Sequence, residues 1–225
     1  MKQKILNNLP ILFLTAISLI LAFQNYTPGT FLSGWDTLHP EFDFGLNFQR
    51  LFFGVFRSEQ GLGALVAHSH MADLPRVILL YIFHYFVPLS FLRYSFIFLN
   101  LILGPIGMYF FLQKVVLKNP ELASRNGAGK IASFLGGLFY LLNLGTMQQF
   151  IVPFEMFITQ YGMLPWIFLF ATRYLESKEQ NKKNLAIFAV IMLLSSPMAY
   201  AATLWYMTFL VFVIYVFTFS FIKRD

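Results

Sequence analysis

Residues 201–222 read AATLWYMTFLVFVIYVFTFSFI, an apolar stretch that contains no charged side chain. A helix of this length extends about 30 Å at 1.5 Å per residue, which matches the hydrocarbon core of a bilayer. The whole chain has the same character: 58% of its 225 residues are hydrophobic, 19% are aromatic and only 12% are charged. A soluble domain of this size needs more polar surface. The sequence therefore predicts an all-α, polytopic helical membrane protein.

Five other apolar runs have the length of a membrane span or come close to it. They are Ile5–Phe23, Leu89–Gln113, Ile131–Gln148, Thr159–Tyr174 and Asn184–Ser196, of which the last is short and stops before a proline. The first run is interpreted as an uncleaved anchor and not as a signal peptide, because Leu21-Ala22-Phe23-Gln24 is a poor cleavage site. About six transmembrane helices are expected, in a single transmembrane domain over residues 1–225.

The placement of the basic residues predicts which loops face the cytoplasm. The run Val77–Val87 stops before Pro88 and is too short to span, so it is expected to lie in the interface. Of the 16 Lys and Arg residues, 12 then fall on one face, and the other four are Arg50, Arg57, Arg76 and Arg93. This imbalance is what the positive-inside rule describes. It predicts a multi-pass protein of the plasma membrane with both termini cytoplasmic, and one large outer loop over residues 24–88 with juxtamembrane helices.

The outer loop begins with an unusual concentration of acid. Asp36, Glu41, Asp43 and His39 all fall within the eight residues 36–43. Asp36 could act as a general base or help to bind a divalent cation, or it could be a turn residue. Glu41 and Asp43 have the same chemical options, with N-capping of the following helix as the alternative. That helix is expected over Phe44–Phe56 and is expected to end at Gly61-Leu62-Gly63.

Other polar residues of the outer face are weaker candidates. His68 and His70 have the spacing of a metal-binding pair, with Asp73 as the nearest third ligand, but a polar lining role is favoured. His39 is a turn residue or a phosphate or sugar contact. The outer arginines could bind phosphate or anchor lipid headgroups, and Arg76 and Arg93 are preferred for phosphate because they flank the non-spanning helix. Glu155 lies in an outer turn near the membrane, where an ionisable group usually has a partner or a function.

Several mechanisms have no support in the sequence. The chain contains no cysteine, which excludes a disulfide framework, a thiolate metal site and a cysteine nucleophile. It carries no Walker loop, no GxGxxG and no nucleophile elbow, so neither an ATP-driven nor a nicotinamide mechanism is indicated. The net charge of +6 is explained by the cytoplasmic loops and does not indicate nucleic-acid binding.

The order of these segments resembles the C-type (GT-C) membrane glycosyltransferases, and most closely the N-terminal membrane region of alpha-(1→3)-arabinofuranosyltransferases. The matching segments are Asp36–Asp43, Phe44–Phe56, Gly61–Asp73 and Leu74–Pro88, within a likeness that covers residues 5–115. Members usually have more spans than six, often with a large outer domain, so the chain is expected to be the N-terminal part of a larger GT-C module.

The resemblance implies a polyprenyl-phosphate sugar donor, an extracytoplasmic glycan acceptor of the cell envelope, and a divalent cation as the one candidate cofactor. It implies Asp36 as the base, with Glu41 and Asp43 as alternatives. The expected donor-phosphate or substrate contacts are Arg76, Arg93, Arg50, His39, His68, His70, Asp73 and Glu155. Two alternatives remain: a transporter or flippase for a lipid-linked or small polar substrate, and a non-catalytic membrane subunit.

Overall fold

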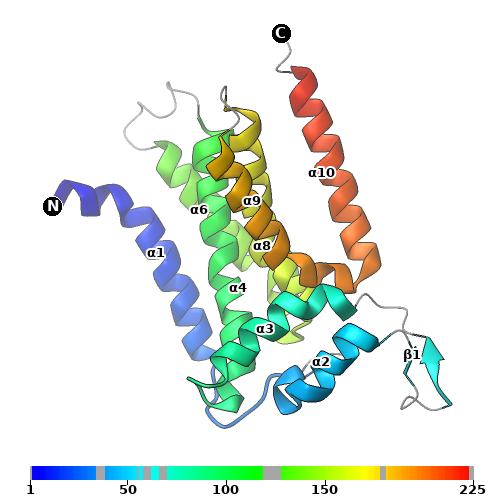
Figure 1. Cartoon of the computed structure of the whole chain (residues 1–225). Coiled ribbons are helices and arrows are strands. Elements are labelled where there is room, and N and C mark those ends of the chain that lie inside the picture. The colour runs from blue at the N-terminus through cyan, green and yellow to red at the C-terminus, as the bar shows by residue number, and fades with distance from the viewer. Residues whose placement is uncertain are drawn as a thin grey trace.

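The computed structural model describes residues 2–33, 39–54, 56–57, 62–65, 70–118, 128–177 and 181–222, and the described chain is almost entirely helical (Figure 1). The longer helices are α1 (Lys2–Gln24), α4 (Leu89–Phe111), α6 (Ala128–Leu142), α8 (Glu155–Leu175), α9 (Lys182–Leu194) and α10 (Ala202–Ile222). The shorter ones are α2 (Phe44–Phe53), α3 (Leu74–Phe83) and α7 (Leu144–Ile151). Single 3-10 turns form η1 (Pro40–Phe42), η2 (His70–Asp73) and η4 (Ser196–Tyr200), and a π-helical segment, η3 (Leu112–Val116), extends α4.

Helix α4 is the centre of the bundle and packs against α1, α6 and α8. Leu92 and Ile97 on α4 are fully buried in these contacts. Two glycines let α8 approach closely: a Cβ at Gly104 would lie 2.5 Å from the Tyr161 ring, and a Cβ at Gly107 would lie 2.6 Å from the Trp166 indole nitrogen. The small residues of the run Leu89–Gln113 therefore determine how close the two central helices come.

Two helices among the described residues are long and apolar enough to cross a membrane. They are α4 with η3, over Leu89–Val116, and α10, with mean hydropathies of 1.9 and 2.0. The bent pair α6 and α7 would be a third if it forms one span. The expected six spans are not confirmed. Helix α9 has only 13 residues, about 20 Å, which is short of a bilayer core.

The run Ile131–Gln148, expected as one span, is broken at Asn143 by 44°. The Asn143 side chain accepts a hydrogen bond from Thr146 N at 3.0 Å and donates one to Tyr140 O at 2.9 Å. It therefore caps the start of α7 while it binds the last turn of α6. One polar side chain converts an apolar run into two helices.

Helix α10 makes the strongest case for a membrane. It stands apart from the other helices in Figure 1, and only 6% of its apolar window is buried. Apolar side chains such as Phe209, Val211 and Phe217 have half or more of their surface exposed. An apolar surface of this extent is unusual in water but expected against lipid.

Helices α2 and α3 lie across one end of the bundle (Figure 1). Helix α3 has 10 residues, about 15 Å, so it cannot cross a bilayer, as expected for the run Val77–Val87. Helix α2 begins at the expected Phe44 but ends at Phe53, where Gly54 N bonds Arg50 O, so the expected bounds of Phe44–Phe56 and the expected end at residues 61–63 were wrong.

Phe56 belongs instead to a small antiparallel hairpin of β1 (Phe56–Arg57) and β2 (Ala64–Leu65). Gly63 adopts a φ of 95° just before β2, a backbone conformation that favours glycine. Two-residue strands are too short to leave a periodic pattern in the sequence.

The start of α1 and the end of α10 lie at the opposite end of the molecule from α2 and α3 (Figure 1). Helices α2 and α3 therefore cover one end of the bundle, and both ends of the described chain lie toward the other end.

Candidate functional site: a buried ionic cluster

Six polar side chains meet at the end of the bundle that α2 and α3 cover. We call them the buried ionic cluster; they are His39, Glu41, Asp73, Arg76, Arg93 and Glu155. They come from η1 and the residue before it, η2, α3, α4 and α8. Five of the six are buried, with at most 6% of each residue exposed. All six were nominated separately by the sequence, and the fold brings them together.

Glu155 lies at the centre of the cluster because it contacts both arginines. Its Oε1 is 2.6 Å from Arg93 Nη2 and 3.6 Å from Arg76 Nη1. Glu155 is in the first turn of α8, where the helix dipole favours a negative charge. It joins α3, α4 and α8 through one carboxylate.

Arg76 is held by a second carboxylate. Its Nε donates to Asp73 Oδ1 at 2.7 Å and its Nη2 donates to Asp73 Oδ2 at 2.5 Å. This is the bidentate arrangement that makes arginine–carboxylate pairs strong. The guanidinium also lies 5.8 Å from the centre of the Phe96 ring. Burial alone would lower the pKa of Arg76, but the nearby Asp73 and Glu155 carboxylates raise it by more than burial lowers it. The net shift of the pKa is upward, so the side chain stays charged.

The other arm of the cluster reaches the acidic segment of the loop. Glu41 Oε1 lies 3.2 Å from His39 Nδ1 and 3.9 Å from Arg93 Nη1. Arg93 Nη1 is also 3.2 Å from His39 Nδ1. Arg93 thus contacts Glu41 on one side and Glu155 on the other. It ties the 3-10 turn η1 to the helical bundle.

Two carboxylate oxygens of this cluster, Glu41 Oε2 and Glu155 Oε1, are buried and have no hydrogen-bond partner among the residues that the structure describes. Glu155 Oε1 lies in ion-pair contact with both arginines, whereas no such contact is seen for Glu41 Oε2 among the described residues. A buried carboxylate oxygen without a donor is costly, so such an atom commonly faces a ligand, an ion or water. Glu41 therefore has a free acceptor position inside the cluster, although its side chain is fully buried.

The formal charges of the cluster do not cancel. Three carboxylates and two guanidiniums leave −3 + 2 = −1 when His39 is neutral. Burying an unbalanced charge is unfavourable, so a bound cationic or proton-donating group would stabilise the site. Both arginines are already paired with carboxylates. A phosphate at Arg76 or Arg93 would therefore have to displace or neutralise a carboxylate.

Asp43 does not join the cluster in this structure. Its Oδ1 accepts a hydrogen bond from Leu46 N at 2.8 Å, which makes it the N-cap of α2. The capping alternative therefore describes Asp43, whereas Glu41 turns into the protein. Arg50 lies in the last turn of α2 and is half-buried.

Of the expected metal-binding histidine pair, the structure describes only His70. His70 is buried in η2, and its ring packs edge-on against Tyr200 at 5.1 Å. Asp73, the expected third ligand, is engaged by Arg76. Over the described ranges, no three His, Cys, Asp or Glu side chains are grouped so as to hold a metal ion. Asp36 and His68 lie outside the described residues.

Sequence reasoning missed the contribution of η4. Ser196 Oγ donates to Ala72 O at 2.7 Å, and Tyr200 packs on His70, so η4 supports η2 just before Asp73. The only sequence signal is the Ser195-Ser196-Pro197 break after α9.

Protein-family models, curated proteins and solved structures were each compared with the chain, and no match was found in any of the three.

Proposed function

We propose that the protein is a membrane glycosyltransferase that moves a sugar from a polyprenyl-phosphate donor to an extracytoplasmic glycan acceptor. Arabinofuranose is the sugar that the family resemblance suggests. In this proposal the chain crosses the plasma membrane six times with both termini in the cytoplasm. The buried ionic cluster then lies at the outer headgroup level, beneath α2 and α3.

The observation that carries the proposal is the unpartnered Glu41 Oε2 beside the Arg93 guanidinium. Glycosyl transfer needs a carboxylate that accepts the proton of the acceptor hydroxyl, and positive charge near the leaving phosphate. Both kinds of group are present at one end of the bundle, at the depth where a lipid-linked donor would present its phosphate.

The proposed reaction is a single displacement. The acceptor hydroxyl oxygen attacks the anomeric carbon of the donor sugar, and the bond from that carbon to the lipid phosphate oxygen breaks. The hydroxyl proton goes to Asp36, with Glu41 as the rival base, and the phosphate leaves with the bonding electrons. Arg76 and Arg93 would supply positive charge for that phosphate once it displaces or neutralises the carboxylates that they hold. A divalent cation would offset the third carboxylate.

The direct test measures sugar transfer in membranes from a radiolabelled polyprenyl-phosphate sugar. Asp36→Asn and Glu41→Gln remove one candidate base each and keep its shape. The variant that removes the true base should lose transfer activity by about 100-fold or more, in the range that general base catalysis supplies. Glu176→Gln is the matched control, because Glu176 pairs with Lys118 at the other end of the bundle. Full transfer activity in both Asp36→Asn and Glu41→Gln would refute the proposal.

A transporter remains the second candidate, and the break between α6 and α7 is the observation that favours it. Transporters use interrupted helices to form a substrate site. Here the break at Asn143 is filled by the chain's own hydrogen bonds to Tyr140 and Thr146. Uptake of a lipid-linked sugar into proteoliposomes without any transferred product would support transport and exclude transfer.

A further inference from the structure

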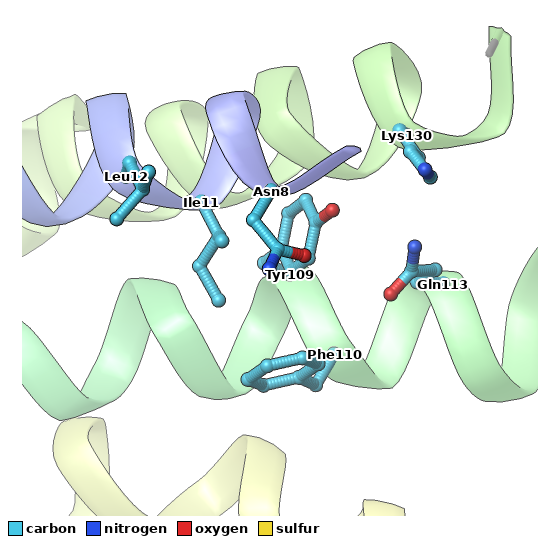
Figure 2. Close-up of a pocket in the computed structure, with 7 residues that line it drawn as sticks. All are labelled: Asn8, Ile11, Leu12, Tyr109, Phe110, Gln113 and Lys130. Carbon is cyan, nitrogen blue, oxygen red and sulfur yellow. The ribbon is translucent and has the colours of Figure 1, made fainter. Parts of the chain in front are cut away.

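Two features outside the buried ionic cluster lie at opposite ends of α4. One is a cavity of about 500 Å³ whose lining includes Asn8, Tyr109 and Gln113 (Figure 2). Gln113 is 20 residues from Arg93 on the continuous segment of α4 with η3, about 30 Å away, and the basic residue of the lining, Lys130, already interacts with a neighbouring group. The other feature is a group of aromatic side chains on α2 and α3, at the end of the bundle where the cluster lies.

We call this second feature the aromatic platform; it consists of Phe44, Phe48, Tyr81, His84 and Tyr85. The Tyr81 ring is at its centre and packs edge-on against the rings of Phe44, Phe48 and Tyr85, with centroid distances of 5.4, 5.5 and 5.6 Å. The His84 ring lies 4.9 Å from that of Tyr81, and His84 Nδ1 donates a hydrogen bond to Tyr81 O. These contacts hold the rings against one another, so the platform is preorganised.

The two tyrosines of the platform face outward. Tyr81 is 38% exposed and Tyr85 is 65% exposed. The Tyr85 hydroxyl donates a hydrogen bond to the Tyr81 oxygen at 2.9 Å. Among the described residues no acceptor is seen for the Tyr81 hydroxyl hydrogen, and both phenolic oxygens keep lone pairs that can accept. The platform therefore presents aromatic surface with a hydrogen-bond donor and acceptors at its rim.

The chemistry of this surface fits a sugar ring. The C–H groups on one face of a sugar pack against the electron-rich face of an aromatic ring, and the sugar hydroxyls form hydrogen bonds at the edge of that ring. No side chain of the platform carries a fixed charge, so it does not select an ion. A quaternary ammonium group needs a space enclosed by rings, whereas these rings contact one another directly. A lipid chain would leave the hydroxyl pair unused.

The platform adjoins the buried ionic cluster along two elements. Phe44 begins α2 three residues after Glu41, and Tyr81 follows Arg76 by five residues on α3, about 7.5 Å along the helix. Helices α2 and α3 also pack against each other. His39, which precedes η1, is the most exposed of the cluster residues in these ion pairs, with 22% of its side chain accessible. A ligand on the platform therefore lies next to the surface side of the cluster.

We propose that the aromatic platform binds a sugar ring of the glycan acceptor and holds the acceptor next to the buried ionic cluster. The sugar ring stacks on Tyr85 and Tyr81, and its hydroxyls form hydrogen bonds with the phenolic pair. The inference rests on the proposed function, because that function makes the glycan an acceptor. Binding of the glycan can nevertheless be measured without any transfer.

Saturation-transfer NMR on the protein in phosphatidylcholine nanodiscs tests the proposal, because it detects sugar protons that lie close to the protein. Nanodiscs avoid sugar-based detergents, which would compete for the platform. The probes are a pentasaccharide of α-linked arabinofuranose and maltopentaose, and at least one should bind at millimolar concentration. Tyr85→Ala should weaken that binding about tenfold, as expected when one stacked ring is lost. Tyr85→Phe keeps the ring and removes the hydroxyl, so its affinity should lie between the two.

Phe86→Ala is the matched control, because Phe86 is the next residue, is also aromatic and is 77% exposed. Its glycan affinity should stay within about twofold of the unsubstituted protein, since the ring contacts of the platform do not include Phe86. Equal losses in Tyr85→Ala and Phe86→Ala would reduce the effect to general surface contact and overturn the platform. Failure of both glycans to bind would overturn it as well.

A membrane contact is the competing use of exposed tyrosines near a bilayer. Tyr85→Trp in nanodiscs with brominated acyl chains separates the two uses, because bromine quenches an indole only at short range. The fluorescence added by the substitution should escape this quenching and should change when the glycan binds. Strong quenching would place residue 85 among the lipids and overturn the proposal.

The binding assay also separates this inference from the proposed function. Full transfer activity in Asp36→Asn and Glu41→Gln would refute the proposed reaction and leave the measured glycan binding in place. Unchanged glycan binding in Tyr85→Ala, with transfer lost in Asp36→Asn or Glu41→Gln, would refute the platform alone.

Discussion

The Arg93 guanidinium contacts the Glu155 carboxylate at 2.6 Å, and this pair joins α4 to α8 at the end of the bundle where the loop helices lie. Both residues are buried, with 2% and 6% of their surface exposed. Arg93 is also the contact through which Glu41 and His39 reach the bundle. The pair is therefore the junction between the helical bundle and the 3-10 turn η1.

Loss of either partner should destabilise the protein strongly. Arg93→Leu and Glu155→Leu each leave a buried charge without its partner, which typically costs about 3–5 kcal/mol. The double substitution should be less harmful than the sum of the two. Thermal unfolding in detergent gives the coupling energy through the double-mutant cycle. The Lys118–Glu176 pair is the comparison, because Lys118 is 61% exposed and its pair should contribute less than about 1 kcal/mol. Additive effects at Arg93 and Glu155 would contradict the junction.

Asp43 should matter for helix α2 and not for chemistry. Asp43→Ala removes the bond from Leu46 N and should cost about 1 kcal/mol of stability. Asp43→Asn keeps an acceptor at the cap and should be close to the unsubstituted protein in unfolding and in sugar transfer. If Asp43→Asn folds normally yet loses transfer, Asp43 takes the role of base that we give to Asp36 or Glu41.

The close approach of α4 and α8 predicts that Gly104 cannot be enlarged. Gly104→Ala places a methyl group where the Tyr161 ring lies, and overpacking of this kind costs about 1–3 kcal/mol. Gly45→Ala is the control, because a Cβ there would lie at an ordinary 3.5 Å from Asp43 Oδ1. The melting temperature in detergent should fall for Gly104→Ala and should not fall for Gly45→Ala. A stable Gly104→Ala protein would show that the two helices can separate freely.

The sidedness of the protein can be measured directly, because the chain contains no cysteine. Leu62→Cys introduces a thiol at a fully exposed residue just before β2, and Lys182→Cys introduces one at the exposed start of α9. With six spans and cytoplasmic termini, a membrane-impermeant maleimide should label Leu62→Cys in intact cells. It should label Lys182→Cys only after the cells are opened. The reverse pattern would invert the topology and move the buried ionic cluster to the cytoplasmic side.

The sequence anticipated individual elements where one local signal dominates. The run Leu89–Gln113 became α4 with η3, and Asp43, one of two acids considered as caps, is the N-cap of α2. The run Ile131–Gln148 is not one continuous helix but a pair bent by 44°, because average hydropathy does not register one capping asparagine at residue 143. The two-residue strands of the hairpin were missed because they are shorter than any repeating pattern.

The candidate site was anticipated as residues but not as an arrangement. Arg76 and Arg93 were nominated as phosphate contacts and Glu155 as a lone ionisable group, whereas in the fold Glu155 contacts both arginines. Glu41 and Asp43 looked equivalent in the sequence, yet one is buried against His39 and the other faces the start of α2. Glu41 lies inside η1 and Asp43 at its end, and the packing of η1 on α4 is what turns Glu41 inward.

By itself the sequence determined the apolar character and the main helices of this protein, because the 22-residue stretch over residues 201–222 carries no charge and is long enough as a helix to cross a bilayer. The tertiary structure alone decided the site. Its charges come from positions between 39 and 155, and they attract one another only after helix packing has removed water from between them. The same packing left one oxygen of Glu41 without a partner among the described residues, which no local pattern encodes.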